Sequence, residues 1–223
     1  MARKEMSVAK IRELDNVARK WGLSEDMLIE NASSNMCSII EKLGLGRKAL
    51  VVSGRGNNGA DVLACARKLA NKKYNVRVAV LESKPLGLQA QLQKSVLENM
   101  GINIFSLNDD TVDQLNVFLN KSDFVLEGLL GVGARGELST LIKKIVFELN
   151  RSKKPIVACD VPSGLYPDTG LSLGEVVKAS YTVTFLALKR GFYLNEGPSA
   201  CGKIILTDIG ISSDFLEKIY NKK

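Results

Sequence analysis

Three short polar stretches, each at the end of an apolar run, hold most of the side chains in this 223-residue sequence that could bind or transform a ligand. The first is Ser53-Gly54-Arg55-Gly56-Asn57-Asn58-Gly59-Ala60-Asp61, after the apolar run 49–52. Its glycines have the spacing G-x-G-x-x-G, which lets a backbone approach an anionic ligand closely. One interpretation is a tight strand-to-helix turn. The other is a loop whose amides bind phosphate or ribose at a helix N-terminus.

Asp61 complicates a simple dinucleotide-binding interpretation of this first stretch. A carboxylate in the first turn of a helix is favoured by the helix dipole, but it would repel a pyrophosphate bound at the same place. We therefore expect a polar part of the ligand other than phosphate to face Asp61.

The second stretch begins with Glu127, directly after the apolar run 124–126. A buried carboxylate is costly unless it is paired with Lys or Arg or bound to a cation. With Asn side chains and hydroxyl groups, Glu127 would form a site of hard oxygen ligands, which suits an s-block metal ion. Glycines at 131, 133 and 136 would let the following loop wrap around a ligand, with Arg135 available for phosphate.

The third stretch, Asp160-Val161-Pro162-Ser163-Gly164, lies at the end of the apolar run 155–161. Asp160 either caps the following turn or serves as a rigidly held acid or base. The second role would be useful here because the sequence contains no His. Ser163 is close enough in sequence to serve the same site through its hydroxyl group.

The absence of His and the spacing of Cys exclude several kinds of catalytic centre. Without His there is no Ser-His-Asp or Cys-His arrangement, and the commonest transition-metal ligand is missing. The four Cys residues stand singly in apolar contexts with no C-x-x-C pair, which argues against a zinc ribbon or a thioredoxin-type centre. They are typical of reduced core thiols, so we expect a cytoplasmic protein.

The charge and hydropathy of the sequence limit the kinds of binding partner that we expect. The net charge of +7 is compatible with a phosphate-bearing ligand, but it is scattered in short runs such as Lys189-Arg190, which is typical of a solvated surface. We therefore expect no nucleic acid partner. The stretch 1–10 is polar and no apolar run approaches 18 residues, so we expect neither a signal peptide nor a membrane span.

Hydrophobic periodicity predicts two N-terminal helices followed by alternating strands and helices. The helices are expected at 7–20 and from an N-cap at Ser24 to about Leu43. Strands are then expected at 49–53, 76–81, 102–107, 124–129 and 155–161, with helices near 60–70, 89–99, 112–120 and 138–150. This alternation predicts one α/β domain over 1–223, Rossmann-like, with three α/β/α layers and a mostly parallel sheet.

Two further strands, at 181–188 and 203–209, have no long helix between them, so we expect an antiparallel edge there. In a doubly wound sheet, ligands bind beyond the carboxyl ends of the strands where the strand order reverses. With the usual order 3-2-1-4-5, the loops after the first, fourth and fifth strands are the three polar stretches. We therefore expect them to form one site.

Taken together, the three stretches resemble the NAD(P)H-hydrate epimerase family (the YjeF N-terminal domain). Further matching segments are Ile11-Arg12-Glu13-Leu14-Asp15, Glu30-Asn31-Ala32, Thr182-Val183-Thr184-Phe185 with Leu188-Lys189, and Thr207-Asp208-Ile209-Gly210-Ile211. The similarity runs in order over nearly the whole chain. It departs from the family pattern where Arg55 replaces Pro, Ala60 and Val62 replace Gly, and Glu127 replaces Asp.

The resemblance implies an isomerase, commonly a homodimer, that interconverts the R and S epimers of hydrated NADH and NADPH. It also implies a potassium ion held by Asn58, Glu127 and Ser163. The residues expected to contact the substrate are Asn57, Asn58, Gly59, Ala60, Asp61, Gly131, Val132, Gly133, Ala134, Arg135, Gly136, Glu137 and Asp160. A separate hydrate dehydratase would be the pathway partner.

The expected chemistry is removal of a hydroxyl group next to the ring nitrogen, through an iminium or ring-opened form, and its return on the other face. Asp160 would transfer the proton and stabilise positive charge on the ring. Two other functions stay open at this point. One is a conventional NAD-dependent oxidoreductase with Glu82 holding the ribose, and the other is an inactive binding module, for example for RNA.

Overall fold

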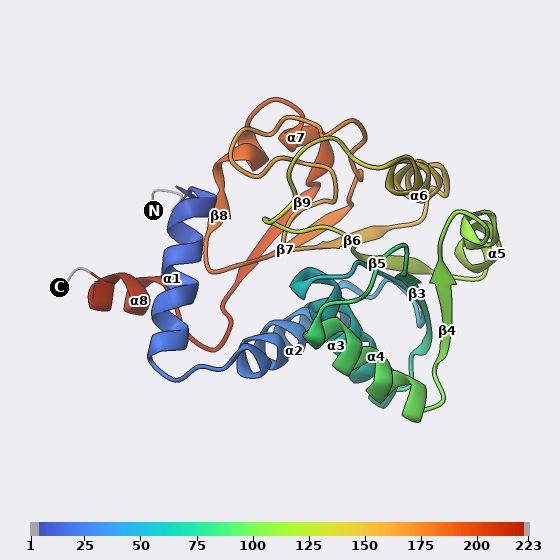
Figure 1. Ribbon diagram of the computed structural model, residues 1–223, viewed down its shortest axis with the longest axis horizontal. Coiled ribbons are helices and arrows are strands. Elements are labelled where there is room, and N and C mark those ends of the chain that lie inside the picture. Colours follow the sequence, from blue (N-terminus) through green and yellow to red (C-terminus); the bar gives the residue numbers. More distant parts are fainter. Residues whose placement is uncertain (1–4, 221–223) are drawn as a thin grey trace.

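The computed structural model describes residues 5–220, so the first four residues of the polar stretch 1–10 and the last three residues of the expected domain lie outside the described residues. Seven parallel strands form the main sheet, in the order β4-β3-β2-β5-β6-β7-β9 (Figure 1). Their bounds are β2 Lys48–Ser53, β3 Asn75–Leu81, β4 Asn103–Leu107, β5 Phe124–Gly128, β6 Ile156–Cys159, β7 Tyr181–Phe185 and β9 Lys203–Thr207. The strand order reverses between β2 and β5, as expected.

Helices cover both faces of the sheet, which confirms the predicted three-layer α/β/α fold class. One hydrophobic cluster joins the sheet to α1 Val8–Lys20, α2 Glu25–Leu43, α3 Asn57–Asn71 and α4 Leu88–Asn99. A second cluster joins the opposite face to α5 Leu115–Asn120 and α6 Thr140–Arg151, with the short 3-10 helix η1 Val112–Gln114 before α5. The β-branched residues of the central strands are therefore buried on both sides.

The first two helices start and stop where their capping residues predict. The Ser7 and Ser24 hydroxyls each accept a hydrogen bond of 3.3 Å from the third residue onward, which satisfies an otherwise free amide of the first turn. Gly44 ends α2 in the left-handed conformation, with φ of 63°. This fixes α1 and α2 beside the carboxyl ends of the strands (Figure 1).

The predicted antiparallel edge is wrong. β7 and β9 pair in parallel, with Tyr181 opposite Lys203. The chain crosses back between them through β8 Leu188–Lys189, the 3-10 helix η2 Arg190–Tyr193 and the one-turn helix α7 Gly197–Ala200, so no long helix is needed for the crossover. A short strand β1 Glu5–Met6 pairs with β8, and α8 Ser213–Tyr220 ends the described chain beside α1.

All four cysteines are buried and free, which confirms the prediction of core thiols. Within residues 5–220, we find no helix with the length and apolar character needed to cross a membrane.

The glycines of the loop between β2 and α3 have different tasks. A methyl group on Gly54 would come 1.8 Å from the carbonyl oxygen of Leu129, and one on Gly59 would come 2.1 Å from that of Gly54. A methyl group on Gly56 would meet nothing within 4 Å. Gly54 is therefore required by packing against the loop after β5 and Gly59 by packing within its own loop, whereas Gly56 borders open space.

This difference gives a stability prediction. Gly54→Ala should unfold the chain or lower its free energy of unfolding by roughly 3 kcal/mol or more, because the clash is with backbone that cannot move aside. Gly56→Ala is the matched control in the same loop and should change that free energy by about 0.5 kcal/mol or less. Urea unfolding followed by circular dichroism measures both. Equal effects of the two substitutions would contradict the assignment.

Candidate functional site

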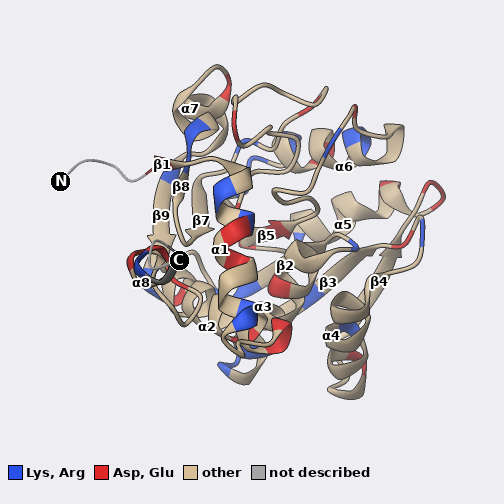
Figure 2. Ribbon diagram, turned by 60° about the vertical axis from the view of Figure 1, so that its left-hand side comes forward, with Lys and Arg blue, Asp and Glu red and all other residues tan. Residues whose placement is uncertain are grey.

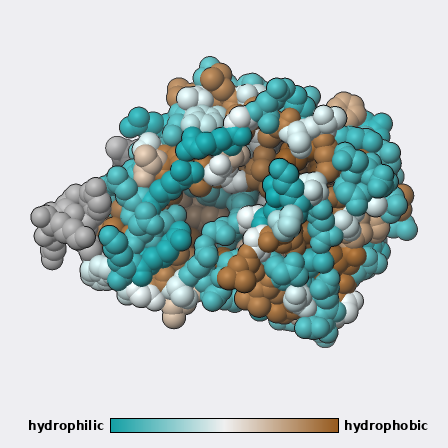
Figure 3. Space-filling view, in the orientation of Figure 1, coloured by the Kyte–Doolittle hydropathy of each residue, from teal (hydrophilic) through white to brown (hydrophobic). Residues whose placement is uncertain are grey.

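A cavity of about 540 Å³ opens at the strand-order reversal, between α1, α2 and the loops that follow β2, β5 and β6. Figure 3 shows the surface hollowed beside α1 in this region. Each of the three polar stretches contributes to the lining: Asn57, Asn58 and Asp61 from the first, residues 131–134 from the second, and Asp160 from the third. The loops that the sequence places at one sheet edge therefore do meet.

Several of the expected site residues lie outside the cavity lining. Gly59 and Ala60 are buried in the first turn of α3, and Glu127 and Ser163 lie buried below the cavity floor. Gly136 and Glu137 are exposed, and Glu137 forms an ion pair with Lys143. Arg135 lines a smaller neighbouring pocket, where it donates a hydrogen bond of 3.4 Å to the Tyr166 hydroxyl.

Asp160 is held at the end of β6 by three donors that all contact one of its carboxylate oxygens. Oδ1 accepts hydrogen bonds from Lys189 Nζ at 2.5 Å, Thr184 Oγ1 at 3.2 Å and the Phe185 amide at 3.3 Å. Its backbone is left-handed, with φ of 61°, a conformation that a non-glycine residue adopts only where the surroundings hold it. Within the described residues Oδ2 accepts no hydrogen bond, so it is available to a ligand.

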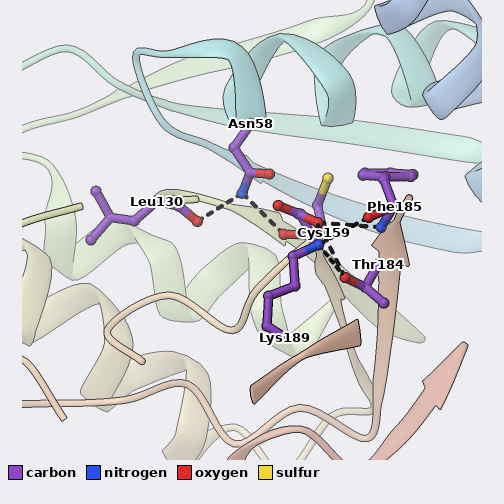
Figure 4. A network of polar contacts seen from close by, with 7 residues as sticks. Asn58, Leu130, Cys159, Thr184, Phe185 and Lys189 are labelled. Carbon is purple, nitrogen blue, oxygen red and sulfur yellow. Dashed lines mark hydrogen bonds and ion pairs between the residues drawn. The ribbon is translucent and has the colours of Figure 1, made fainter. Parts of the chain in front are cut away.

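Lys189 is one of the cavity-lining residues that the sequence interpretation missed. Its side chain is 1% exposed, so assigning it to a solvated surface run is wrong. The ammonium group lies between Asp160 Oδ1, Thr184 Oγ1 and the Phe185 carbonyl oxygen, the last at 3.1 Å (Figure 4). The signal available was the Leu188-Lys189 match that carried part of the family resemblance.

Two further carboxyl groups, those of Asp15 and Asp61, line the cavity, and neither is hydrogen-bonded to a cation from residues 5–220. Burial raises the pKa of Asp15 to about 6, with a further rise from Asp160 that Arg19 and Lys189 partly offset. Burial also raises the pKa of Asp61, and the charges of Asp160, Asp15 and Glu25 raise it further. Asp15 comes from α1, whose acidic and basic bands are visible in Figure 2. Both groups therefore keep their protons to a higher pH than an exposed Asp does.

Glu127 has no Lys or Arg partner within the described residues, so the predicted alternative of a salt bridge is not found. Its carboxylate accepts hydrogen bonds from the Ser163 hydroxyl at 2.7 Å, the Ser163 amide at 3.0 Å and the Leu129 amide at 3.2 Å. Burial raises the pKa of Glu127 to about 7, against the lowering effect of these hydrogen bonds. A fully buried carboxylate without a cation is electrostatically uncompensated.

The oxygen atoms around Glu127 suit a monovalent cation. Asn58 Nδ2 donates to the carbonyl oxygens of Leu130 and Cys159, at 2.7 and 3.1 Å (Figure 4). The side-chain oxygen of Asn58 accepts no hydrogen bond in the described part of the chain. In that part, no group of three or more Cys, Asp or Glu side chains could hold a metal ion. One carboxylate among neutral oxygens matches the charge of a potassium ion.

The carboxyl group of Asp15 predicts a pH-dependent cost to stability. Because its pKa rises from 3.8 to about 6 on folding, the folded chain holds a proton that the unfolded chain releases between those values. Its contribution to the free energy of unfolding therefore falls as the pH rises from about 4 to 6. Asp15→Asn should stabilise the fold by about 1 to 3 kcal/mol at pH 7.5 and by much less at pH 4.

Urea unfolding at both pH values measures this difference. Glu13→Gln, an exposed substitution on the same helix, is the charge-matched control and should show no such pH dependence. An Asp15→Asn variant that is less stable than the parent protein at pH 7.5 would overturn the electrostatic assignment.

Curated relatives cover nearly all of this chain. A protein of Elusimicrobium minutum named NAD(P)H-hydrate epimerase is 30% identical over 97% of this chain and 100% of its own length. One of Oenococcus oeni with the same name is 32% identical over 88% of this chain and 91% of its own. The Thermofilum pendens protein named bifunctional NAD(P)H-hydrate repair enzyme Nnr is 32% identical over 95% of this chain, which spans 42% of that relative's length.

The fold is shared with a solved structure as well. The crystal structure of yeast ynu0 superposes with a TM-score of 0.78 at 22% identity, covering 92% of this chain and 88% of that one. Residues 25–191, three quarters of the chain, match the family described as YjeF-related protein N-terminus. By this match and by its relatives, the chain belongs to the YjeF-related N-terminal family.

Proposed function

We propose that this protein is an isomerase that interconverts the R and S epimers of hydrated NADH and NADPH. Asp160 carries the proposal, because it lines the cavity, its Oδ1 is held by Lys189, and its Oδ2 accepts no hydrogen bond within the described residues. The names of the relatives that match over most of both chains support it. Against the oxidoreductase alternative, Glu82 is paired with Lys94 at 3.0 Å and does not line the cavity.

The cavity provides the groups that inversion of a hydroxyl-bearing carbon needs. One carboxyl group protonates the hydroxyl, and the carbon–oxygen bond breaks as the lone pair of the ring nitrogen forms an iminium. Water then adds to the opposite face and gives its proton to a carboxylate. Asp160 transfers a proton in this scheme, and its charge stabilises the cationic ring. Asp15 and Asp61 supply the cavity with further exchangeable protons.

The Asn pair and the loop after β5 position the rest of the substrate. Asn57 Nδ2 donates a 2.6 Å hydrogen bond to Glu25, which holds the first loop against α2 at the cavity rim. Residues 131–134 form the opposite wall. Arg135 and Glu137 lie farther along that loop, and their contact with substrate requires a ligand that extends beyond the cavity.

A potassium ion is part of the proposal, held by Asn58, Glu127 and Ser163. The uncompensated charge of Glu127 and the free oxygen of Asn58 support this assignment. When bound, the ion would orient oxygens of the surrounding loops or of the substrate. Because Asn58 also lines the cavity, binding at this site would fix one of the substrate-facing side chains.

We further propose that the protein acts in the cytoplasm as a homodimer. We also propose that a separate hydrate dehydratase removes water from the epimer that this protein produces. The Thermofilum relative is named a bifunctional hydrate repair enzyme, and this name supports a second repair activity that works beside the epimerase. The buried, free cysteines are compatible with a reducing compartment.

Purified R-hydrates of NADH and NADPH, incubated with the protein and followed by chiral chromatography, should convert to the S form. Asp160→Asn should reduce the rate by at least about 100-fold, because an amide cannot exchange the proton. This substitution leaves the buried ammonium of Lys189 without its counter-charge, so we expect it to lower stability as well.

The double variant Asp160→Asn with Lys189→Gln separates the two effects. It should recover much of the lost stability, since no unpaired charge remains, but none of the activity. Near-normal turnover by either variant would reject Asp160 as the acid-base group. No conversion by the wild-type protein would reject the epimerase, and salt-sensitive RNA binding would then support the binding module.

Thermal unfolding tests the potassium site. Replacing choline chloride by potassium chloride at constant ionic strength should raise Tm by about 3 to 6 °C, since an ion at ten times its dissociation constant stabilises by roughly 1.4 kcal/mol. Glu127→Gln should abolish this response. Glu148→Gln, at another buried glutamate far along α6, should retain it. Equal Tm values in the two salts would contradict the site.

A further inference from the structure

The positively charged residues that line the cavity differ in whether they already have a partner within the protein. Lys189 pairs with Asp160, Arg19 lies 3.8 Å from Glu25, and Arg12 donates a 3.2 Å hydrogen bond to the Val132 carbonyl oxygen. These three positive groups are therefore already held by the protein itself.

Arg55 is the exception. The residue lines the cavity and is half-buried, yet within the described residues its guanidinium forms neither an ion pair nor a hydrogen bond. Nor is it among the principal charges that shift the pKa values of Asp15 and Asp61. A guanidinium offers five donors in a rigid fork, so a half-buried one without acceptors is a group prepared for an anion from outside the chain.

The backbone holds this residue in place and keeps space beside it. The Arg55 carbonyl oxygen accepts a 2.8 Å hydrogen bond from the Gly87 amide, which ties the loop after β2 to the loop after β3. Gly56 follows directly and borders open space on its side-chain side. The space on the side-chain side of Gly56, directly after Arg55, is therefore open to a ligand group.

We propose that Arg55 is a specificity-determining residue that binds a phosphate group of the dinucleotide substrate. This inference rests on the proposed function. Phosphate is the anionic group that such a substrate carries, and guanidinium binds it with two parallel hydrogen bonds. The phosphate then lies at the Arg55 end of the cavity, and the hydrated ring lies at Asp160, where the uncharged ring does not oppose the surrounding carboxyl groups.

The test compares three substrates in wild type and in Arg55→Ala: the R-hydrates of NADH and NADPH, and the R-hydrate of reduced nicotinamide riboside, which has no phosphate. Loss of a charged hydrogen bond should raise KM by roughly tenfold or more, with kcat little changed. A rise for both dinucleotides assigns the pyrophosphate. A rise for the NADPH hydrate alone assigns the 2′-phosphate. KM for the riboside hydrate should not change in either case.

Two matched variants complete the experiment. Arg55→Lys keeps the charge but loses the forked geometry, so it should restore part of the affinity. Lys121→Ala removes one exposed positive charge at the amino end of β5, outside the cavity lining, and should leave KM unchanged. Unchanged KM for both dinucleotides in Arg55→Ala, or an equal rise for the riboside hydrate, would overturn the proposal.

Calorimetric binding of NADH, NADPH and reduced nicotinamide riboside keeps this inference separate from the epimerase assignment. If the wild-type protein converts no hydrate, the proposed function fails, and the binding data still decide the role of Arg55. Two results together support the phosphate contact: Arg55→Ala binds the dinucleotides more weakly than the wild type, and the affinity of the wild type falls at high salt. Identical affinities in the two proteins reject it.

Discussion

The buried ammonium of Lys189 constrains the architecture of the site. An uncompensated charge at 1% exposure would cost several kcal/mol, so the chain must bring acceptors to it. Asp160 at the end of β6 supplies the counter-charge, and the end of β7 supplies Thr184 and the Phe185 carbonyl oxygen. Left-handed residues at Asp160 and at Leu186, with φ of 61° and 63°, are the local strain that makes this convergence possible.

The strand that carries Lys189 also pairs with the segment that leads into the N-terminal helices. In the β1–β8 pairing, Met6 lies opposite Lys189, and Ser7 then caps α1, which carries Asp15. The position of Asp15 over the cavity therefore depends on the strand that also holds Lys189. The result is a cavity with carboxyl groups from α1, α3 and the end of β6, and burial raises the pKa values of Asp15 and Asp61 above that of an exposed Asp. A protein without His obtains its exchangeable protons in this way.

Much of this arrangement was predictable because it follows from local patterns. Apolar, β-branched runs predicted five strands to within a few residues. Their alternation with helices predicted that these strands pair in parallel and at which edge of the sheet the loops meet. The last crossover was not predictable by that route, since residues 190–200 make it with a 3-10 helix and a single helical turn. Lys189 and Asp15 were missed because their burial depends on β1, β7 and α1 packing together, and no spacing along the chain encodes that contact.

The glycines of the first two loops require a changed interpretation. A motif in which the backbone approaches closely was expected to make room for a ligand, but Gly54 makes room for the loop after β5 and Gly59 for the backbone of its own loop. Gly54 packs on the Leu129 carbonyl oxygen, and side chains at Gly128 and Gly131 would approach Asn58 at 2.6 and 3.1 Å. Asn58 in turn joins the loops after β5 and β6 through two carbonyl oxygens. Gly54, Gly128 and Gly131 therefore allow the loops after β2 and β5 to pack together, and the chemistry belongs to the polar side chains that this packing brings together.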